Sequence, residues 1–536
     1  MHEKVLKGIK ISTHKTDMFF MVFFCKSMQL LSADEFLTSG HQAVLCNYSM
    51  NECNILQLLA AYKANCITEE KQIRLKLQFL SLRFSPLDLN NYLCRCLNKR
   101  YKVMEISELY RIFEQHPVVT TDSRDCPKDS IFFALKGASF NGNAFAQKAI
   151  DEGCAFAVVD EKEFAKEDDK RFILVDNCLK ALQQLANYHR RKLGTKIIGI
   201  TGTNGKTTTK ELVATVLQKK YNVLYTQGNF NNDIGVPKTL LRLKPEHEIA
   251  VVEMGASHPG DIKELVDIVE PDCGIITNVG KAHLQGFGSF EGVIKTKGEL
   301  YDFLREHGGQ VFIHNENEHL RGIADGLQLV RYGTTADVPS LAVCGEVVSC
   351  APLLKFRWKK ADGEWHEVQT HLIGAYNVLN MLAAACIADF FGVDEEDIST
   401  ALRDYVPTNN RSQLEVTDSN RLIVDTYNAN PTSMKAALEN FRLMQVDHKM
   451  AILGDMRELG EVSHEEHQKV VDFLKENGID NVWLVGEEFG KTDCNFRKFH
   501  DVEEVKAEIA ANKPEGFYIL IKGSNGIKLF QLPALL

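Results

Sequence analysis

The sequence predicts an α/β protein of several domains, with one domain built on a parallel sheet that binds phosphate. Three observations lead to this fold class. The 536 residues are enough for about three to four domains at roughly 100–200 residues each. Apolar strand-like runs alternate with amphipathic helical segments, which is the pattern of a parallel sheet covered by helices. A glycine-rich loop joins one of these strands to the next helix, as in phosphate-binding sheets.

The composition excludes several classes of protein. Hydrophobic residues make up 44% of the chain, which is enough for a sizeable core. The formal net charge is −10, which argues against a nucleic-acid coat or a binder of anionic membranes. No apolar run approaches the roughly 18 residues of a membrane span. The 14 cysteines are scattered without a CxxC pair, so we expect neither a zinc site nor a disulfide framework, and a cytoplasmic location.

Residues 1–103 differ in composition from the rest of the chain. They carry 14 Lys and Arg against 8 Asp and Glu, whereas the remainder carries 48 against 64. The apolar run at 18–24 has the length of a short signal-peptide core, but no small-x-small cleavage site follows it. We therefore interpret 1–103 as an atypical extension and expect Met104 to be the natural start. Intact-mass analysis of the native protein tests this expectation.

Three blocks follow. Residues 104–192 open with an amphipathic helical pattern and contain strand-like runs at 130–135 and 155–159. Residues 193–408 open with the strand 196–200, the glycine loop and a helix with a core-facing apolar stripe. Further strands are predicted at 249–252 and 274–277, and hairpin material at 341–372 around residues 361–363. Residues 409–536 form a smaller α/β unit, with buried-type strands at 422–424, 450–453, 482–485 and 518–521.

The loop at 201–208 is the strongest motif. Its sequence is Thr201-Gly202-Thr203-Asn204-Gly205-Lys206-Thr207-Thr208. Glycines allow backbone N–H groups to approach phosphate, Lys206 would neutralise the β- and γ-phosphates, and the Thr207 hydroxyl would ligate Mg²⁺. The strict pattern has another glycine where this chain has Ile200. The alternative is an ordinary glycine turn, which the flanking strand and helix make a poor explanation.

Two further residues follow strands of the same sheet. Glu253 ends the strand at 249–252, and His283 follows the strand at 274–277. Ligands of open α/β sheets gather at the carboxyl ends of the strands, and a carboxylate with an imidazole can hold a divalent ion there. Each residue alone has a simpler interpretation, Glu253 as an acidic residue at a helix N-terminus and His283 as a loop histidine.

The motifs together resemble those of the Mur ligase family. The phosphate loop at 201–208 has the family's form, which also explains the absent first glycine. Residues 228–237 resemble the family's substrate loop. Residues 425–431 and 454–460 resemble the branch of the family that adds D-alanyl-D-alanine, and the closing motif is present as Lys522-Gly523-Ser524. The resemblance covers about 104–536 and does not include 1–103.

The resemblance implies a three-domain fold: a domain at 104–192 for the UDP-sugar-peptide, a central ATPase domain at 193–408, and a C-terminal Rossmann-like domain at 409–536 that closes over ATP. It implies an ATP-dependent ligase that joins D-alanyl-D-alanine to UDP-N-acetylmuramoyl-tripeptide, a step of peptidoglycan biosynthesis. The tripeptide carboxylate would take the γ-phosphoryl group of ATP, and the amine of the dipeptide would attack the acyl phosphate. We expect a monomer that binds neither nucleic acid nor membranes.

The resemblance also carries roles to single residues. Thr207 and Glu253 would ligate magnesium, and His283 would help hold a second ion. Lys297 matches a lysine that related ligases carbamylate, although it could be a solvated helix lysine and Lys295 is close by. The nucleotide would contact Thr203, Asn204, Gly205, Lys206, Thr207, Thr208, Asn377, Arg411 and Asp425, where Asn377 could instead be a helix N-terminal polar residue.

The substrate residues come from all three blocks. Residues 121–124 and 132–137 resemble the uridine-nucleotide segment, although the phenylalanines in it fit a core strand better. The substrates would contact Ser123, Arg124, Asn231, Asn232, Thr239, Asn428, Asn430 and Ser433.

Three other functions fit the sequence less well. A sister ligase that adds one amino acid carries an Asp-Asn-Pro-Arg type of motif, which we do not find. Folylpolyglutamate synthase fits neither the first block nor the third-block motifs. A non-catalytic ATP-binding scaffold would have no need for Glu253, His283 and Lys297 together.

Overall fold

The computed structural model describes residues 104–166, 168–335, 340–407 and 411–536. The expectations for 1–103 lie outside the described residues. The described part is α/β, as predicted, and contains three sheets of four, nine and six strands. No helix in this part is long and apolar enough to cross a membrane.

The first block holds a small parallel sheet in the order β2-β3-β4-β5. Helix α6 (Ile106–Gln115) is the amphipathic helix predicted after Met104, and it buries Leu109 and Phe113. Helix α8 begins at an Asn177 cap and ends at Gly194 in the left-handed conformation. The elements are β2 (Val119–Thr120), β3 (Ile131–Phe133), α7 (Ala146–Glu152), β4 (Phe156–Val159), β5 (Phe172–Leu174) and α8 (Cys178–Leu193).

The central sheet has the order β14-β13-β12-β11-β10-β9-β6-β8-β7. Strands β7 to β12 pair in parallel, and β12, β13 and β14 add an antiparallel extension that includes the predicted hairpin. Strand β6 lies between β8 and β9, so the carboxyl ends of these three strands meet at one edge. The strands are β6 (Lys196–Thr201), β7 (Val223–Tyr225), β8 (Ile249–Glu253), β9 (Cys273–Ile276), β10 (Gln310–His314), β11 (Gln328–Gly333), β12 (Leu341–Cys350), β13 (Leu353–Lys360) and β14 (His366–Ile373).

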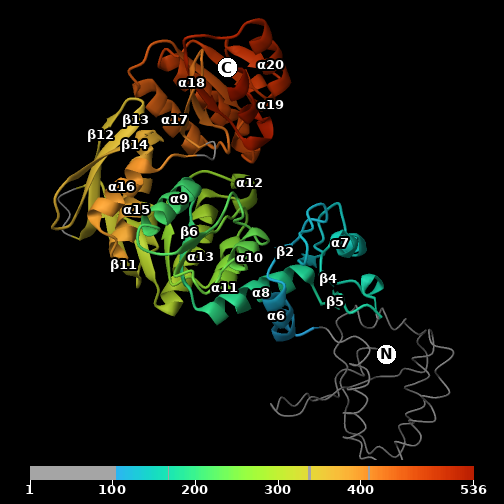
Figure 1. The fold of residues 1–536 in the computed structure, drawn as a ribbon. Helices are drawn as coiled ribbons and strands as arrows, with labels where there is room; N and C mark the ends of the chain where they lie inside the picture. Colours follow the sequence, from blue (N-terminus) through green and yellow to red (C-terminus); the bar gives the residue numbers. More distant parts are fainter. Residues whose placement is uncertain (1–103, 167, 336–339, 408–410) are drawn as a thin grey trace, which may run out of the picture. The chain divides into compact units, whose positions relative to one another are not determined.

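Helices cover both faces of this sheet (Figure 1). Helix α9 (Lys206–Leu217) packs on one face beside α15 (Val378–Phe390), which is apolar on all sides, and α16 (Glu395–Asp404). Helices α10 (Gly235–Leu240), α11 (Asp261–Val269) and α13 (Phe290–His307) cover the other face, and α8 packs on α10 and α11. The short helices α12 (Leu284–Phe287) and α14 (Glu318–Gly322) complete the block.

The C-terminal sheet has the order β15-β16-β20-β17-β18-β19, parallel except for the edge strand β15. All four strands predicted here are present as β16, β17, β18 and β20. The elements are β15 (Gln413–Val416), β16 (Arg421–Asp425), α17 (Pro431–Leu443), β17 (Lys449–Gly454), α18 (Ser463–Glu476), β18 (Val482–Val485), α19 (Glu487–Gly490), β19 (Arg497–Phe499), α20 (Val502–Ala511) and β20 (Tyr518–Lys522).

The extension of the central sheet also contributes to the C-terminal core. Ile373, the last residue of β14, is buried in one hydrophobic cluster with Phe441 of α17. Asn440 of α17 accepts hydrogen bonds at Oδ1 from the Ala375 backbone N–H (3.3 Å) and from the Cys350 thiol (3.4 Å). Polar and apolar contacts therefore both link α17 to this sheet edge.

Candidate active site

The phosphate loop leaves β6 and enters α9 with two glycines in the left-handed region, Gly202 (φ +142°) and Gly205 (φ +78°). A Cβ on Gly202 would lie 2.0 Å from the hydroxyl of Thr277, so this position requires glycine. The residues after β9 hold the loop in place. The Asn204 backbone N–H donates to Asn278 Oδ1 (3.0 Å), and the Thr277 hydroxyl donates to the Asn204 carbonyl (2.7 Å).

Lys206 lies at the start of α9, and its ammonium group turns back over the loop. Its Nζ donates to the carbonyl oxygens of Gly202 (2.7 Å) and Thr203 (3.1 Å). Burial lowers the pKa of Lys206 to about 8, and the nearby Glu253 carboxylate only partly offsets this effect. The site therefore carries a cation that is incompletely compensated, which suits the binding of a polyphosphate.

The Glu253 carboxylate lies buried at the end of β8, with 1% of the residue exposed. Its Oε1 accepts hydrogen bonds from the Thr207 hydroxyl (3.2 Å) and from Asn231 Nδ2 (2.8 Å). Its Oε2 is buried without a hydrogen-bond partner in the described residues. An orphaned carboxylate oxygen beside a threonine hydroxyl is the donor set that a magnesium ion would satisfy. These residues fit the ion that the sequence predicted.

His283 begins helix α12 with its backbone in the left-handed region (φ +51°). Burial lowers the pKa of its imidazole, although the Glu458 carboxylate against Nδ1 acts in the opposite direction. A neutral imidazole is the form that binds a metal ion. The loop histidine predicted from sequence therefore has a constrained backbone and a charged neighbour.

Lys297 and Lys295 differ sharply in burial. Lys297 in α13 is 2% exposed, whereas Lys295 is exposed. Burial, with a contribution from the Lys206 charge, holds the pKa of Lys297 well below its usual value. Within the described residues no hydrogen bond or ion pair involves the Lys297 amine, and its Nζ lies 5.4 Å from the centre of the Phe287 ring. A lowered pKa favours the neutral amine, which is the nucleophilic form of lysine.

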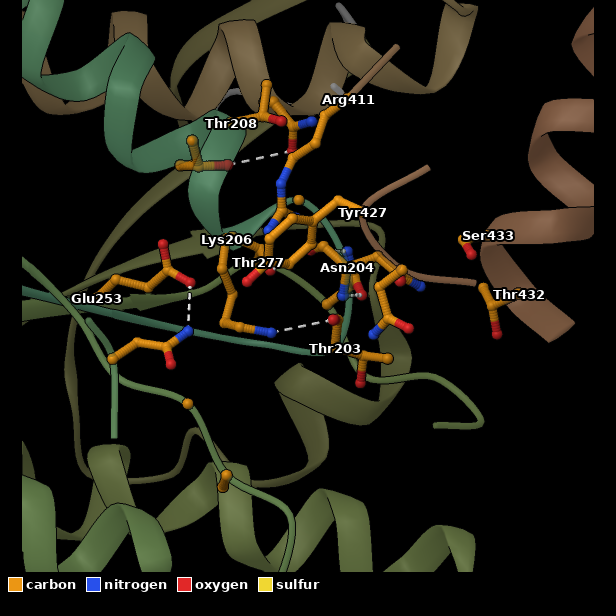
Figure 2. Close-up of a pocket in the computed structure, with 18 of the residues that line it drawn as sticks. Thr203, Asn204, Lys206, Thr208, Glu253, Thr277, Arg411, Tyr427, Thr432 and Ser433 are labelled. Carbon is orange, nitrogen blue, oxygen red and sulfur yellow. Dashed lines mark hydrogen bonds between the residues drawn. The ribbon is translucent and has the colours of Figure 1, made fainter. Parts of the chain in front are cut away.

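A cavity of about 720 Å³ joins the phosphate loop to the C-terminal block (Figure 2). Its volume is that of a site for a sizeable small molecule. The predicted residues that line it are Thr203, Asn204, Gly205, Lys206, Thr208, Asn231, Asn232, Glu253, His283, Asn377, Arg411, Asp425, Asn428 and Ser433. Residues separated by more than 200 positions in the chain therefore line one cavity.

On the C-terminal side, Arg411 stacks on the Tyr427 ring at 3.8 Å (both are labelled in Figure 2). Asp425 pairs with Lys522 Nζ at 2.6 Å, and Lys522 is 1% exposed. Tyr427 lies within the motif at 425–431 and Lys522 within the closing motif, but the sequence analysis assigned a role to neither. Nothing local in the sequence signalled the contacts that they make.

Asn430 has a structural role. Its Oδ1 caps α17 by accepting from the Ser433 backbone N–H (2.9 Å), and the Ser433 hydroxyl accepts from the Asn430 N–H. Its Nδ2 donates to Asn204 Oδ1 (2.8 Å) and so connects α17 to the phosphate loop. The Asn-Pro-Thr-Ser sequence carries a capping signal that could have predicted this role.

Two asparagines on the central block also use their side chains locally. Asn232 Oδ1 accepts from the Gly235 N–H (2.8 Å) at the start of α10. Asn377 Nδ2 donates to the Ile373 carbonyl, and its Oδ1 accepts from Asn380. Asn377 is the N-cap residue of α15, as the simpler interpretation expected, and it also lines the cavity.

The structure does not bring every predicted residue to this cavity. Thr239 is 1% exposed and its hydroxyl donates to the Gly235 carbonyl (3.0 Å) one turn earlier in α10, so a direct substrate contact expected for it has no geometric support. Ser123 and Arg124 lie in the first block, between β2 and β3. The Arg124 side chain is 83% exposed and pairs with Asp122.

Comparison with known protein families identifies the domains that carry this site. The Mur ligase middle domain matches residues 200–388, the Mur ligase glutamate ligase domain matches 410–525, and the Mur ligase family catalytic domain matches 117–190. The chain belongs to the Mur ligase family. Its family membership makes it an ATP-dependent ligase, as the motifs predicted.

Relatives within the Mur ligase family cover most of the chain. The UDP-N-acetylmuramoyl-tripeptide–D-alanyl-D-alanine ligase of Bacillus subtilis is 35% identical over 428 residues, which are 77% of this chain and 92% of the relative. The enzyme of the same name from Escherichia coli is 34% identical over 69% of this chain and 81% of its own.

Solved structures agree with the fold. MurF from Acinetobacter baumannii matches with a TM-score of 0.70 at 31% identity, over 78% of this chain and 92% of its own. The MurF ligase from Thermotoga maritima in complex with ADP matches with a TM-score of 0.69 at 26% identity, over 78% and 96%.

Proposed function

We propose that this Mur ligase joins D-alanyl-D-alanine to UDP-N-acetylmuramoyl-tripeptide at the expense of ATP, and so makes the pentapeptide precursor of peptidoglycan in the cytoplasm. The observation that carries the proposal is the single cavity that holds both the phosphate loop and the Asp425–Asn428 segment of the C-terminal block. The first element binds a nucleotide, and the second resembles the branch of the family that uses the dipeptide. The names of the two relatives support the same substrates.

The phosphate end of the site performs the activation step. A carboxylate is a poor electrophile, and transfer of the γ-phosphoryl group from ATP to the tripeptide carboxylate gives it a phosphate leaving group. Two anions must approach each other, so the Lys206 ammonium and the N-terminus of α9 would offset their repulsion. Arg411 and Asp425 would contact the nucleotide from the C-terminal side, and Asn377 would lie near the adenine.

Magnesium would be held by Thr207 and the orphaned Glu253 Oε2, with a second ion at His283 and a carbamylated Lys297. Bound there, magnesium would supply positive charge against the phosphate oxygens of ATP. Carbamylation would turn the Lys297 amine into an anionic oxygen ligand. The burial of Lys297 and the exposure of Lys295 make Lys297 the candidate of the two.

The substrates would enter from two sides. Asn428 and Ser433 line the cavity from the C-terminal block, where the dipeptide amine must approach the acyl phosphate. The amine would attack the acyl carbon to form a tetrahedral intermediate. Loss of the amine proton and of the phosphate would then leave the amide. Asn231 and Asn232 would face the peptide end of the nucleotide sugar, and the segment with Ser123 and Arg124 would bind its uridine end. Closure of the C-terminal domain over the cavity would exclude water and limit hydrolysis of the acyl phosphate.

Phosphate release by the full-length chain tests the proposal. The assay contains ATP, Mg²⁺ and UDP-N-acetylmuramoyl-tripeptide, with and without D-alanyl-D-alanine, and mass spectrometry follows the product. We expect release that requires both substrates and a product heavier by one dipeptide unit. Release with a single amino acid in place of the dipeptide would indicate a sister ligase and contradict the proposal.

A matched pair of variants tests the carbamate. Lys297→Ala should lose most of the activity, whereas Lys295→Ala, two residues away on an exposed position, should retain it. Depletion of bicarbonate should slow the wild type and leave the residual rate of Lys297→Ala unchanged. Full activity in Lys297→Ala would show that the carbamate role is wrong.

A further inference from the structure

The His283 imidazole contacts the Glu458 carboxylate across two blocks of the chain. The Nδ1 atom of His283, at the start of α12 in the central block, faces the carboxylate of Glu458. Glu458 lies in the loop that follows β17 in the C-terminal block. His283 lines the cavity, whereas Glu458 is not among the lining residues and its side chain is 60% exposed.

Both partners have backbones in the left-handed region, with φ of 51° at His283 and 64° at Glu458. This conformation is unfavourable for residues other than glycine and persists where the surroundings impose it, often at functional sites. An ion pair with an exposed carboxylate returns little free energy of folding. Stability therefore does not explain why the chain holds these two side chains together.

The loop that carries Glu458 is held by a buried network. The Asp455 carboxylate accepts hydrogen bonds from the backbone N–H groups of Glu488 (3.0 Å) and Phe489 (2.9 Å). The Met456 N–H donates to Nε2 of His467, a fully buried residue (3.0 Å). The residues before Glu458 are therefore fixed to other elements of the C-terminal block, so Glu458 moves together with that block.

Contacts on both sides of the pair bring the two blocks together. Asn430 of α17 donates to Asn204 in the phosphate loop (2.8 Å), and Lys281 lies 3.9 Å from Glu466 of α18. The pair of His283 and Glu458 belongs to this set of contacts. Of these three contacts, the one between His283 and Glu458 includes a residue that is expected to hold an ion.

We propose that Glu458 is a positioning residue for His283. Its carboxylate lies against Nδ1 and would accept a hydrogen bond from the proton there, which would fix the tautomer and turn the ring so that the Nε2 lone pair serves as the ligand. A carboxylate or carbonyl behind a metal-binding histidine commonly orients the ring in this way. The inference rests on the proposed function, since it assumes an ion at His283. It adds that the C-terminal block, which carries the dipeptide residues, completes the ion site when it docks.

Ion affinity in the full-length protein tests this role. Electron paramagnetic resonance with Mn²⁺ and ADP measures the affinity of the ion site at His283, and the ADP affinity is measured in the same samples. Glu458→Ala should weaken Mn²⁺ about tenfold or more, Glu458→Gln should fall between it and the wild type, and ADP affinity should stay within about twofold. Glu461→Ala, an exposed carboxylate three residues away, is the matched control and should change neither value.

The tautomer is a second readout that a purely structural role would not alter. In ¹⁵N-histidine-labelled protein, the His283 signals, assigned by their loss in His283→Asn, should show a proton on Nδ1 in the wild type and a tautomer mixture in Glu458→Gln. Unchanged Mn²⁺ affinity and an unchanged tautomer in both Glu458 variants would overturn the inference. If the wild type failed to ligate the dipeptide but Mn²⁺ binding still depended on Glu458, the proposed function alone would fail.

Discussion

ATP binding should take up protons through Lys206. Burial lowers the pKa of this lysine to about 8. Bound phosphates would return the pKa to at least the ordinary 10.5. A difference of about 2.5 pKa units corresponds to up to about 3 kcal/mol of coupling between proton and nucleotide. Binding at pH 8 should therefore take up about 0.5 proton per site.

The sign of the pH dependence follows from these values. ATP favours the protonated lysine, so affinity is fully present below pH 8 and is lost as the pH rises toward 10.5. Between pH 7 and pH 9.5 the affinity for MgATP should fall about 25-fold. Isothermal titration calorimetry at pH 8, in two buffers of different ionisation enthalpy, gives the proton uptake directly.

Lys206→Arg is the control, because a guanidinium stays protonated over this range. Lys297 also has a lowered pKa and lies close enough to respond to phosphate, so the difference between wild type and Lys206→Arg isolates the Lys206 contribution. Equal proton uptake in the two proteins, or less than about 0.1 proton in the wild type, would refute the reasoning.

Three further outcomes follow from the structure. Asn430→Ala should lower the free energy of unfolding in urea by about 1 kcal/mol through loss of the α17 cap, and Ser433→Ala, which keeps the cap acceptor, should cost less. Asp425→Ala leaves the buried Lys522 ammonium unpaired and should cost about 3 kcal/mol in the same assay, most of which Lys522→Met should restore in the double variant. Thr239→Val should leave the KM for UDP-N-acetylmuramoyl-tripeptide within about twofold of wild type, because the hydroxyl is used inside α10; a larger rise would restore a substrate contact.

Sequence reasoning placed the features that depend on short stretches of chain. The phosphate loop and Glu253 were found because each directly follows an apolar strand, and parallel strands bring their carboxyl ends to one edge. Periodicity likewise located the four main strands of the C-terminal sheet. Thr239 lies inside α10 with its hydroxyl bonded to the Gly235 carbonyl, and the substrate contact expected for it stays a prediction.

The contacts that complete the site are long-range. The stack of Arg411 on Tyr427 and the pair of His283 with Glu458 join segments that no local pattern relates. The same applies to Asn278, which holds the phosphate loop from the end of the next strand. The sequence shows which residue types are suited to binding a nucleotide and an ion. Which of them are in contact depends on the packing of the sheets and helices.

The way Ile373 enters the C-terminal core has a consequence for unfolding. Because β14 supplies an apolar residue to that core and Asn440 binds the backbone next to β14, the central and C-terminal sheets are not independent modules. A fragment cut near residue 411 would lose part of its hydrophobic cover, and chemical denaturation of the intact chain should melt both sheets in one cooperative transition. Hydrogen exchange would then report a similar opening free energy for the amides of β14 and of α17.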